Sequence, residues 1–198
     1  MREMDSRDDL QMNAKAIAAV SVFAALTIVL NLSPFKIAAP FAPFLYYQIW
    51  EIPIVAAFLL YDPLMGIAVA AINTVVLLFI FPGALPTGPL YNLAAILGML
   101  IGIYIVQRFS AGHSLERKES LVTIFSTAVG ILSRVGVMSF VNWAFLRYPP
   151  PVGFSIPEEA LVAMLPIIGL FNATLALYTI PMGYILARAV SSRIKTEM

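Results

Sequence analysis

The apolar run from Leu121 to Leu146 carries an arginine near its middle, and this arginine constrains the fold of the chain more than any other residue. The run exceeds the roughly 20 apolar residues that a membrane-spanning helix needs. A guanidinium at the bilayer centre costs about 2.5–3.5 kcal/mol on insertion scales. Arg134 must therefore face protein or a wet cavity and find hydrogen-bond acceptors there.

Three further residues of the same run point to a pocket. Residues four apart share a helix face, so Arg134, Met138 and Asn142 form one stripe, with Trp143 beside it. We interpret this stripe as the wall of a substrate pocket. The alternative interpretation is that Arg134 ties two helices together through carbonyl groups or a buried partner.

The composition places the chain among integral membrane proteins. Hydrophobic residues make up 61% of the sequence and charged residues 12%, against roughly 25% charged residues in soluble domains. The 198 residues leave room for six short-looped spans and no separate soluble domain. The sequence has no cysteine, and its single histidine, His113, lies in a polar loop. We therefore expect no enzyme, no metal site, no cofactor and no nucleic-acid partner.

Hydropathy divides the chain into two tails, residues 1–12 and 191–198, and one membrane domain, residues 13–190. The predicted spans cover residues 13–32, 53–61, 64–81, 90–106, 121–146 and 161–190. The second is so short that Glu51, just before it, is expected below the outer surface. Pro166 and Pro181 should bend or break the sixth. The segment from Ser33 to Glu51 holds three prolines and many aromatic residues, which predicts a long structured loop.

Charge asymmetry predicts the orientation of the bundle. Nine cations fall on the side of the termini and two on the other side, which places both termini in the cytoplasm of a multi-pass cell-membrane protein. The aromatic loop, Asn92, Asn142 and Trp143 then converge near the outer surface. No G-x-x-x-x-G-K-[ST] motif is present, so any energy source lies in another protein. A self-contained secondary transporter and a structural subunit are the other classes considered.

Small residues form a ridge along the first predicted helix. Ala14, Ala18, Ser21 and Ala25 recur at spacings of four, three and four residues. Small side chains on one helix face allow a second helix to approach closely. The ridge predicts either a docking surface for a partner or close packing inside the bundle.

The order of short motifs resembles the substrate-binding S component of an energy-coupling factor (ECF) vitamin transporter, most nearly its riboflavin-binding branch. The motifs that carry the resemblance extend over most of the chain: Ala24-Ala25-Leu26-Thr27, Glu51-Ile52-Pro53, Pro63-Leu64-Met65-Gly66, Asn92-Leu93-Ala94-Ala95, Val137-Met138, Asn142-Trp143 and Phe171-Asn172. The chain departs from the riboflavin branch at Ala70, Asn73 and residues 173–176. Another vitamin or a related small molecule is therefore the alternative ligand.

The resemblance implies a six-helix, all-α bundle that binds a vitamin, most nearly riboflavin, under its first loop. It implies docking onto a transmembrane coupling protein that two ABC ATPases drive, through Ser21 and Ala25 with Ala18 nearby. It also implies a pocket lined by Asn92, Asn142 and Asn172. Combining the resemblance with the residue patterns, we expect the substrate-binding residues to be Asn92, Asn142, Trp143, Asn172, Tyr91, Arg134, Glu51, Gln48 and Trp50.

Overall fold

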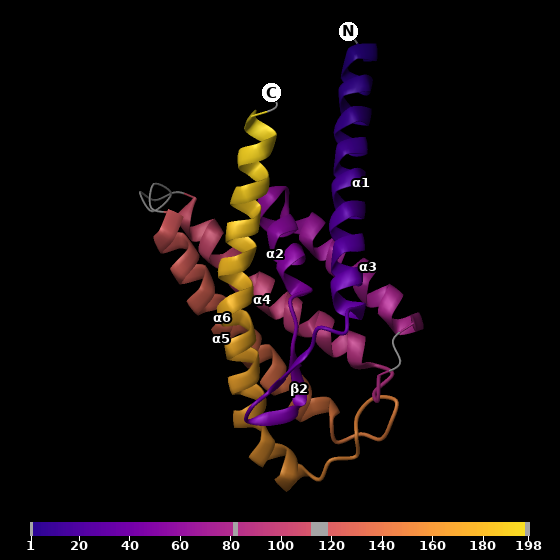
Figure 1. Cartoon of the computed structure of the whole chain (residues 1–198), viewed down its shortest axis with the longest axis vertical. Helices are drawn as coiled ribbons and strands as arrows, with labels where there is room; N and C mark the ends of the chain where they lie inside the picture. Colours follow the sequence, from indigo (N-terminus) through magenta and orange to yellow (C-terminus); the bar gives the residue numbers. More distant parts are fainter. Residues whose placement is uncertain (1, 81–82, 112–118, 197–198) are drawn as a thin grey trace.

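The computed structural model describes residues 2–80, 83–111 and 119–196 (Figure 1). Within these ranges the chain forms six helices and one two-stranded sheet, in the order α1 (Arg2–Leu32), β1 (Ile37–Ala39), β2 (Ala42–Tyr47), α2 (Glu51–Leu60), α3 (Pro63–Ile80), α4 (Gly88–Ser110), α5 (Glu119–Phe145) and α6 (Glu158–Thr196). The predicted helical membrane fold is confirmed.

Four of the described helices, α3, α4, α5 and α6, are long and apolar enough to cross a membrane. The apolar part of α1, Ala16–Leu32, and the whole of α2 are shorter. At 1.5 Å per residue, the ten residues of α2 span about 15 Å, half of a hydrocarbon core. The chain is thus a multi-pass membrane protein in which one helix begins within the bundle.

Both chain termini lie at the same end of the bundle, at the top of Figure 1. We name this the terminal end, and the opposite end, which carries β1, β2 and the loop of residues 146–157, the hairpin end. The helix α1 extends back to Arg2, so residues 2–12, expected as a polar tail, continue the helix. The helix α6 runs through Pro166 and Pro181 as one helix of 39 residues, so neither proline breaks it.

The segment between α1 and α2, predicted as a loop, contains an antiparallel hairpin. Ile37 pairs with Tyr47, Ala38 with Tyr46 and Ala39 with Ala42, with a register shift between Ala38 and Ala39. The prolines exclude a helix here, and strand pairing supplies hydrogen-bond partners for backbone that enters an apolar environment. Sequence patterns did not predict this pairing, because Pro40 and Pro43 interrupt the usual strand pattern.

The short helix α2 lies at the centre of the bundle. Its first eight residues, Glu51 to Phe58, are all buried, and it contacts α1, α3 and α6. The largest core cluster gathers side chains of α2 around Ile54 and Val55, which are fully buried, together with Met99 and Ile180 from α4 and α6. A central helix with apolar residues on every face is buried on every face.

Two glycines of α4, Gly98 and Gly102, allow α4 and α5 to cross at very short range. A Cβ atom on Gly102 of α4 would lie 2.6 Å from the Cα of Gly130 in α5. A Cβ atom on Gly98, one turn earlier, would lie 3.0 Å from Val137 Cβ. Small residues spaced by four let helix backbones approach in lipid, where close contact is the main source of association. This crossing fixes α5, and with it Arg134, against α4.

Candidate substrate site

Arg134 and Glu51 form a buried ion pair in the middle of the bundle. The guanidinium of α5 and the carboxylate at the first residue of α2 make two hydrogen bonds, Nη1 to Oε2 at 2.5 Å and Nη2 to Oε1 at 2.9 Å. Both residues are 2% exposed. The N-terminus of α2 adds a favourable helix dipole for the carboxylate. The sequence required a partner for Arg134, and the structure places Glu51 there.

Two neighbours complete the environment of the guanidinium. Arg134 Nε donates to Asn172 Oδ1 of α6 at 3.0 Å, and Nη1 also lies 3.7 Å from Met99 Sδ of α4. The amide of Asn172 donates in turn to the Ile168 carbonyl at 2.9 Å. Four helices therefore meet at Arg134. Asn172, expected to read a substrate, hydrogen-bonds to a protein side chain in this structure.

The stripe predicted along α5 is buried as a whole. Arg134, Met138 and Asn142 are 2%, 7% and 7% exposed. Asn142 lies two turns from Arg134 towards the hairpin end, and its Nδ2 donates to the Met138 carbonyl at 2.6 Å. Trp143, beside this stripe, is 40% exposed, and the Arg147 guanidinium lies 4.5 Å from its ring. Asn142 thus faces the bundle, while Trp143 stands near its edge.

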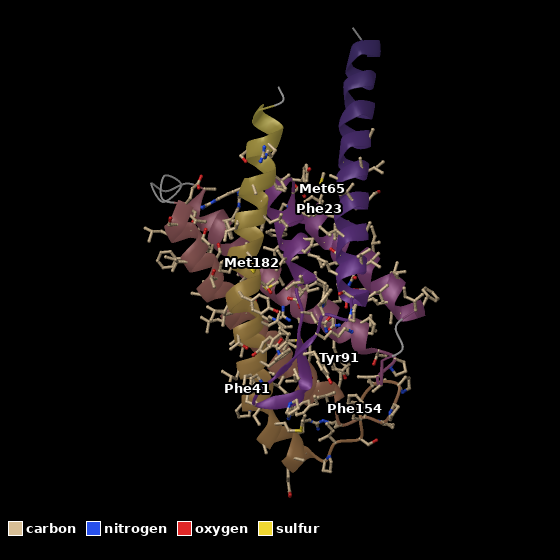
Figure 2. All side chains as sticks on the ribbon, viewed as in Figure 1. Phe23, Phe41, Met65, Tyr91, Phe154 and Met182 are labelled. Carbon is tan, nitrogen blue, oxygen red and sulfur yellow. The ribbon has the colours of Figure 1, made fainter. Side chains whose placement is uncertain are left out.

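Tyr91 secures the loop at the hairpin end. Its hydroxyl donates to the Val152 carbonyl at 2.7 Å, and Thr87 Oγ1 donates to the Pro151 carbonyl at 2.6 Å. Figure 2 shows Tyr91 and Phe154 in the half of the molecule opposite the termini. The start of α4 therefore anchors the loop of residues 146–157. The neighbouring Asn92 is exposed in the isolated chain.

The hairpin is held against α6 by two tyrosines. The hydroxyls of Tyr47 and Thr174 lie 2.7 Å apart, and Tyr178 donates to the Gln48 carbonyl at 2.5 Å. The Tyr47 ring also packs against Phe171, with 5.1 Å between ring centroids. These contacts hold the hairpin against the face of α6 that carries Phe171, Thr174 and Tyr178.

Two more predicted residues follow the hairpin directly. Gln48 is partly buried, and its Oε1 is a buried atom without a hydrogen-bond partner among the described residues. Trp50, immediately before α2, is 3% exposed and belongs to the main core cluster. Trp50 is therefore covered by the bundle itself in this structure.

The residues of the predicted ridge on α1 point away from the bundle. Ala18, Ser21 and Ala25 are all exposed, whereas Phe23, Ala24 and Thr27 of the same helix are buried. Close packing of the ridge inside this chain is therefore not what the structure shows. The surface stays open to lipid or to a second protein.

A cavity of about 430 Å³ lies at the terminal end, between α2, α4, α5 and α6. Its polar wall includes Gln107, Tyr184 and the ion pair of Glu119 with Arg188, whose atoms lie 3.1 Å apart. None of the nine predicted substrate-binding residues lines this cavity. In the described part of the chain, no group of three or more metal-binding side chains was found.

These features define the class of protein: a multi-pass helical membrane protein with a charge-balanced polar centre and an ordered hairpin packed against α6. No family model matches the chain, and no curated protein matches it. Its fold is similar to a solved structure of the S component of a bacterial ECF transporter, with a TM-score of 0.72 and 20% sequence identity. The match covers 92% of this chain and 99% of the other.

Proposed function

We propose that this protein is the membrane-embedded, substrate-binding S component of an ECF-type ABC importer. The observation that carries the proposal is the fold likeness, which extends over nearly the full length of both chains. At 20% identity this likeness concerns the fold, so the function rests on it together with the order of motifs along the sequence.

The outward ridge of α1 supports the assignment of partners. Ala18, Ser21 and Ala25 are small and exposed on a helix that also shows lipid-facing Val22 and Val29, each 65% exposed. Helices in lipid associate by close van der Waals contact, which small residues permit. We therefore propose that a transmembrane coupling protein docks here and that two ABC ATPases drive the complex.

For the transported ligand we propose a vitamin, with riboflavin as the first candidate. The motif order favours the riboflavin-binding branch, and the buried amides of Asn142 and Asn172 supply polar groups without net charge. Amides both donate and accept hydrogen bonds, so they suit a flat ligand with carbonyl and imino edges. The alternatives are another vitamin and a related small molecule. A yellow colour of the purified protein would indicate bound flavin directly.

The experiment that tests the proposal separates binding from transport. The purified chain in liposomes should bind riboflavin without concentrating it, and uptake should appear only after reconstitution with the coupling protein and ATPases. Concentration of riboflavin by the chain alone would contradict the proposal and favour a self-contained secondary transporter. One observation favours the secondary transporter as a second candidate. Glu51 is a buried carboxylate at the centre of the bundle, and many ion-coupled carriers have such a group.

A further inference from the structure

The two charges at the centre of the bundle, on Arg134 and Glu51, neutralise each other. Glu51 accepts through both carboxylate oxygens, and both bonds come from the same guanidinium. We propose that the substrate site takes a molecule without net charge that carries amide-type carbonyl and N–H groups, and that Glu51 sets this selectivity by neutralising Arg134. This inference rests on the proposed function, because it assigns the substrate class of the same site.

One N–H group of the Arg134 guanidinium has no hydrogen-bond acceptor among the described residues. A guanidinium has five N–H groups. Nε donates to Asn172, Nη1 reaches Glu51 and Met99, and Nη2 donates to Glu51. The second N–H of Nη2 meets no acceptor in the described part of the chain. Because the positive charge is already balanced, this N–H suits a neutral carbonyl oxygen.

Neutral acceptors are left over on the adjoining segments. Gln48 Oε1 is buried without a partner, three residues before Glu51, and Tyr178 binds the backbone carbonyl of the same glutamine. Thr179 Oγ1, two turns from Asn172 along α6, is likewise buried without a partner among the described residues. An N–H or hydroxyl group of a ligand would satisfy such atoms. The unsatisfied hydrogen-bond acceptors on these two segments are thus uncharged.

A charged ligand would meet an opposing member of the ion pair. A carboxylate that approached Arg134 would also approach Glu51, because the two side chains share two hydrogen bonds. An ammonium group would meet Arg134 in the same way. Like charges that come together in a desolvated site are strongly disfavoured, which excludes wrong ligands. Both residues are 2% exposed, so solvent screens this repulsion little.

Binding of matched neutral and acidic molecules tests the inference. We would measure the affinity of the purified, full-length chain for riboflavin and thiamine. Three amide or alcohol and acid pairs complete the panel: nicotinamide with nicotinate, panthenol with pantothenate, and biotinamide with biotin. We expect the tightest ligand to be uncharged and the neutral member of any bound pair to bind at least about tenfold more tightly than its acid. A charged molecule as the tightest ligand would overturn the inference and leave the proposed function standing. If no molecule of the panel bound, both the inference and riboflavin as the proposed ligand would be contradicted, and the role as an S component would be judged by assembly with the coupling protein and ATPases.

Substitution of Glu51 tests its role in the selectivity. Glu51→Gln leaves the charge of Arg134 unbalanced, so the preference for the neutral ligand should fall about tenfold or more relative to the acid. The charge-balanced variant Glu51→Gln/Arg134→Gln should fold and restore the neutral preference. The control Glu159→Gln, which changes an exposed carboxylate at the start of α6, should not alter it. An unchanged preference in Glu51→Gln, or a double variant that prefers the acid, would contradict the role assigned to Glu51.

Discussion

The centre of the bundle and the outward face of α1 hold the two groups of residues to which function was assigned from sequence, and their surroundings differ completely. At the centre, Arg134 and Glu51 are 2% exposed and satisfy one another. On α1, Ala18 and Ser21 are exposed, and no other helix of this chain covers them. A charged or strongly polar group in lipid must find a hydrogen-bond partner within the chain. A small side chain can stay exposed to lipid until a second protein binds.

The two regions should therefore differ in how substitutions affect stability. Substitutions at the centre should damage the isolated protein, and substitutions on the α1 face should damage only the assembled complex.

The largest effect is expected from Arg134→Met. This change leaves Glu51 buried without its partner and removes the hydrogen bond to Asn172, so it should cost about 3–5 kcal/mol of stability. Thermal unfolding in detergent measures the loss. The matched control is Arg134→Met/Glu51→Leu, which removes both charges and should recover most of the stability. A double variant no more stable than Arg134→Met would show that the unpaired carboxylate is not the cause.

A somewhat smaller effect is expected at the crossing of α4 and α5. Gly102→Ala places a methyl group 2.6 Å from the Cα of Gly130, so the helices must separate, at a typical cost of about 1–3 kcal/mol. Gly136→Ala in α5 is the control, because its Cβ atom would meet nothing within 4 Å. Equal melting temperatures for the two variants would contradict the close crossing.

The two buried asparagines should behave differently. Asn172→Leu removes an acceptor of Arg134 and should lower stability and ligand affinity together, with about 1–3 kcal/mol lost on stability. Asn142→Leu removes a side chain that bonds only its own helix, so affinity should fall while the melting temperature changes little. Measuring both quantities for both variants separates a substrate contact from a structural one. Unchanged affinity in Asn142→Leu would place that residue outside the site.

A smaller effect should follow from loosening the hairpin. Tyr178→Phe removes the hydroxyl that donates to the Gln48 carbonyl, at a cost of about 0.5–1.5 kcal/mol. Proteolysis of the segment between α1 and α2 should speed up in this variant. Tyr148→Phe is the control, since this tyrosine is 52% exposed in the loop after α5. Identical cleavage rates would mean that the anchor on α6 does not hold the hairpin.

Periodicity and composition were sufficient to predict the helical bundle, because a membrane allows few alternatives to helices whose backbone is satisfied internally. They also predicted that Arg134 needs a partner and that Met138 and Asn142 share its face. The partner could have been sought by charge alone, since Glu51 is the acidic residue that borders an apolar segment too short to span a bilayer.

The hairpin and the contacts of Tyr91 could not be predicted in this way. The hairpin pairs Ile37 with Tyr47, and the prolines between them interrupt the strand pattern in the sequence. Tyr91 hydrogen-bonds to Val152, 61 residues later in the chain. Contacts of this range depend on how the helices pack, which single-sequence patterns do not describe. Tyr91 and Trp143 therefore looked alike as aromatic site candidates, although one anchors a loop and the other is 40% exposed.

The smallest effect on the isolated protein is expected from bulk on the exposed face of α1. Ala25→Trp should leave the melting temperature and substrate affinity unchanged. Ala25 is exposed, so the larger side chain can extend into lipid without displacing other residues of this chain. Leu132→Trp is the matched control, since Leu132 is a lipid-facing residue of α5 that is 71% exposed.

The central claim, that the protein binds substrate and depends on a docked partner for transport, is tested most directly by uptake through the reconstituted complex. With the coupling protein and ATPases present, Ala25→Trp should abolish assembly and ATP-dependent uptake while its ligand affinity equals that of the wild type, and Leu132→Trp should transport normally. The physical reason is that bulk at a close helix contact prevents that contact. An Ala25→Trp complex that assembles and transports like the wild type would contradict the account.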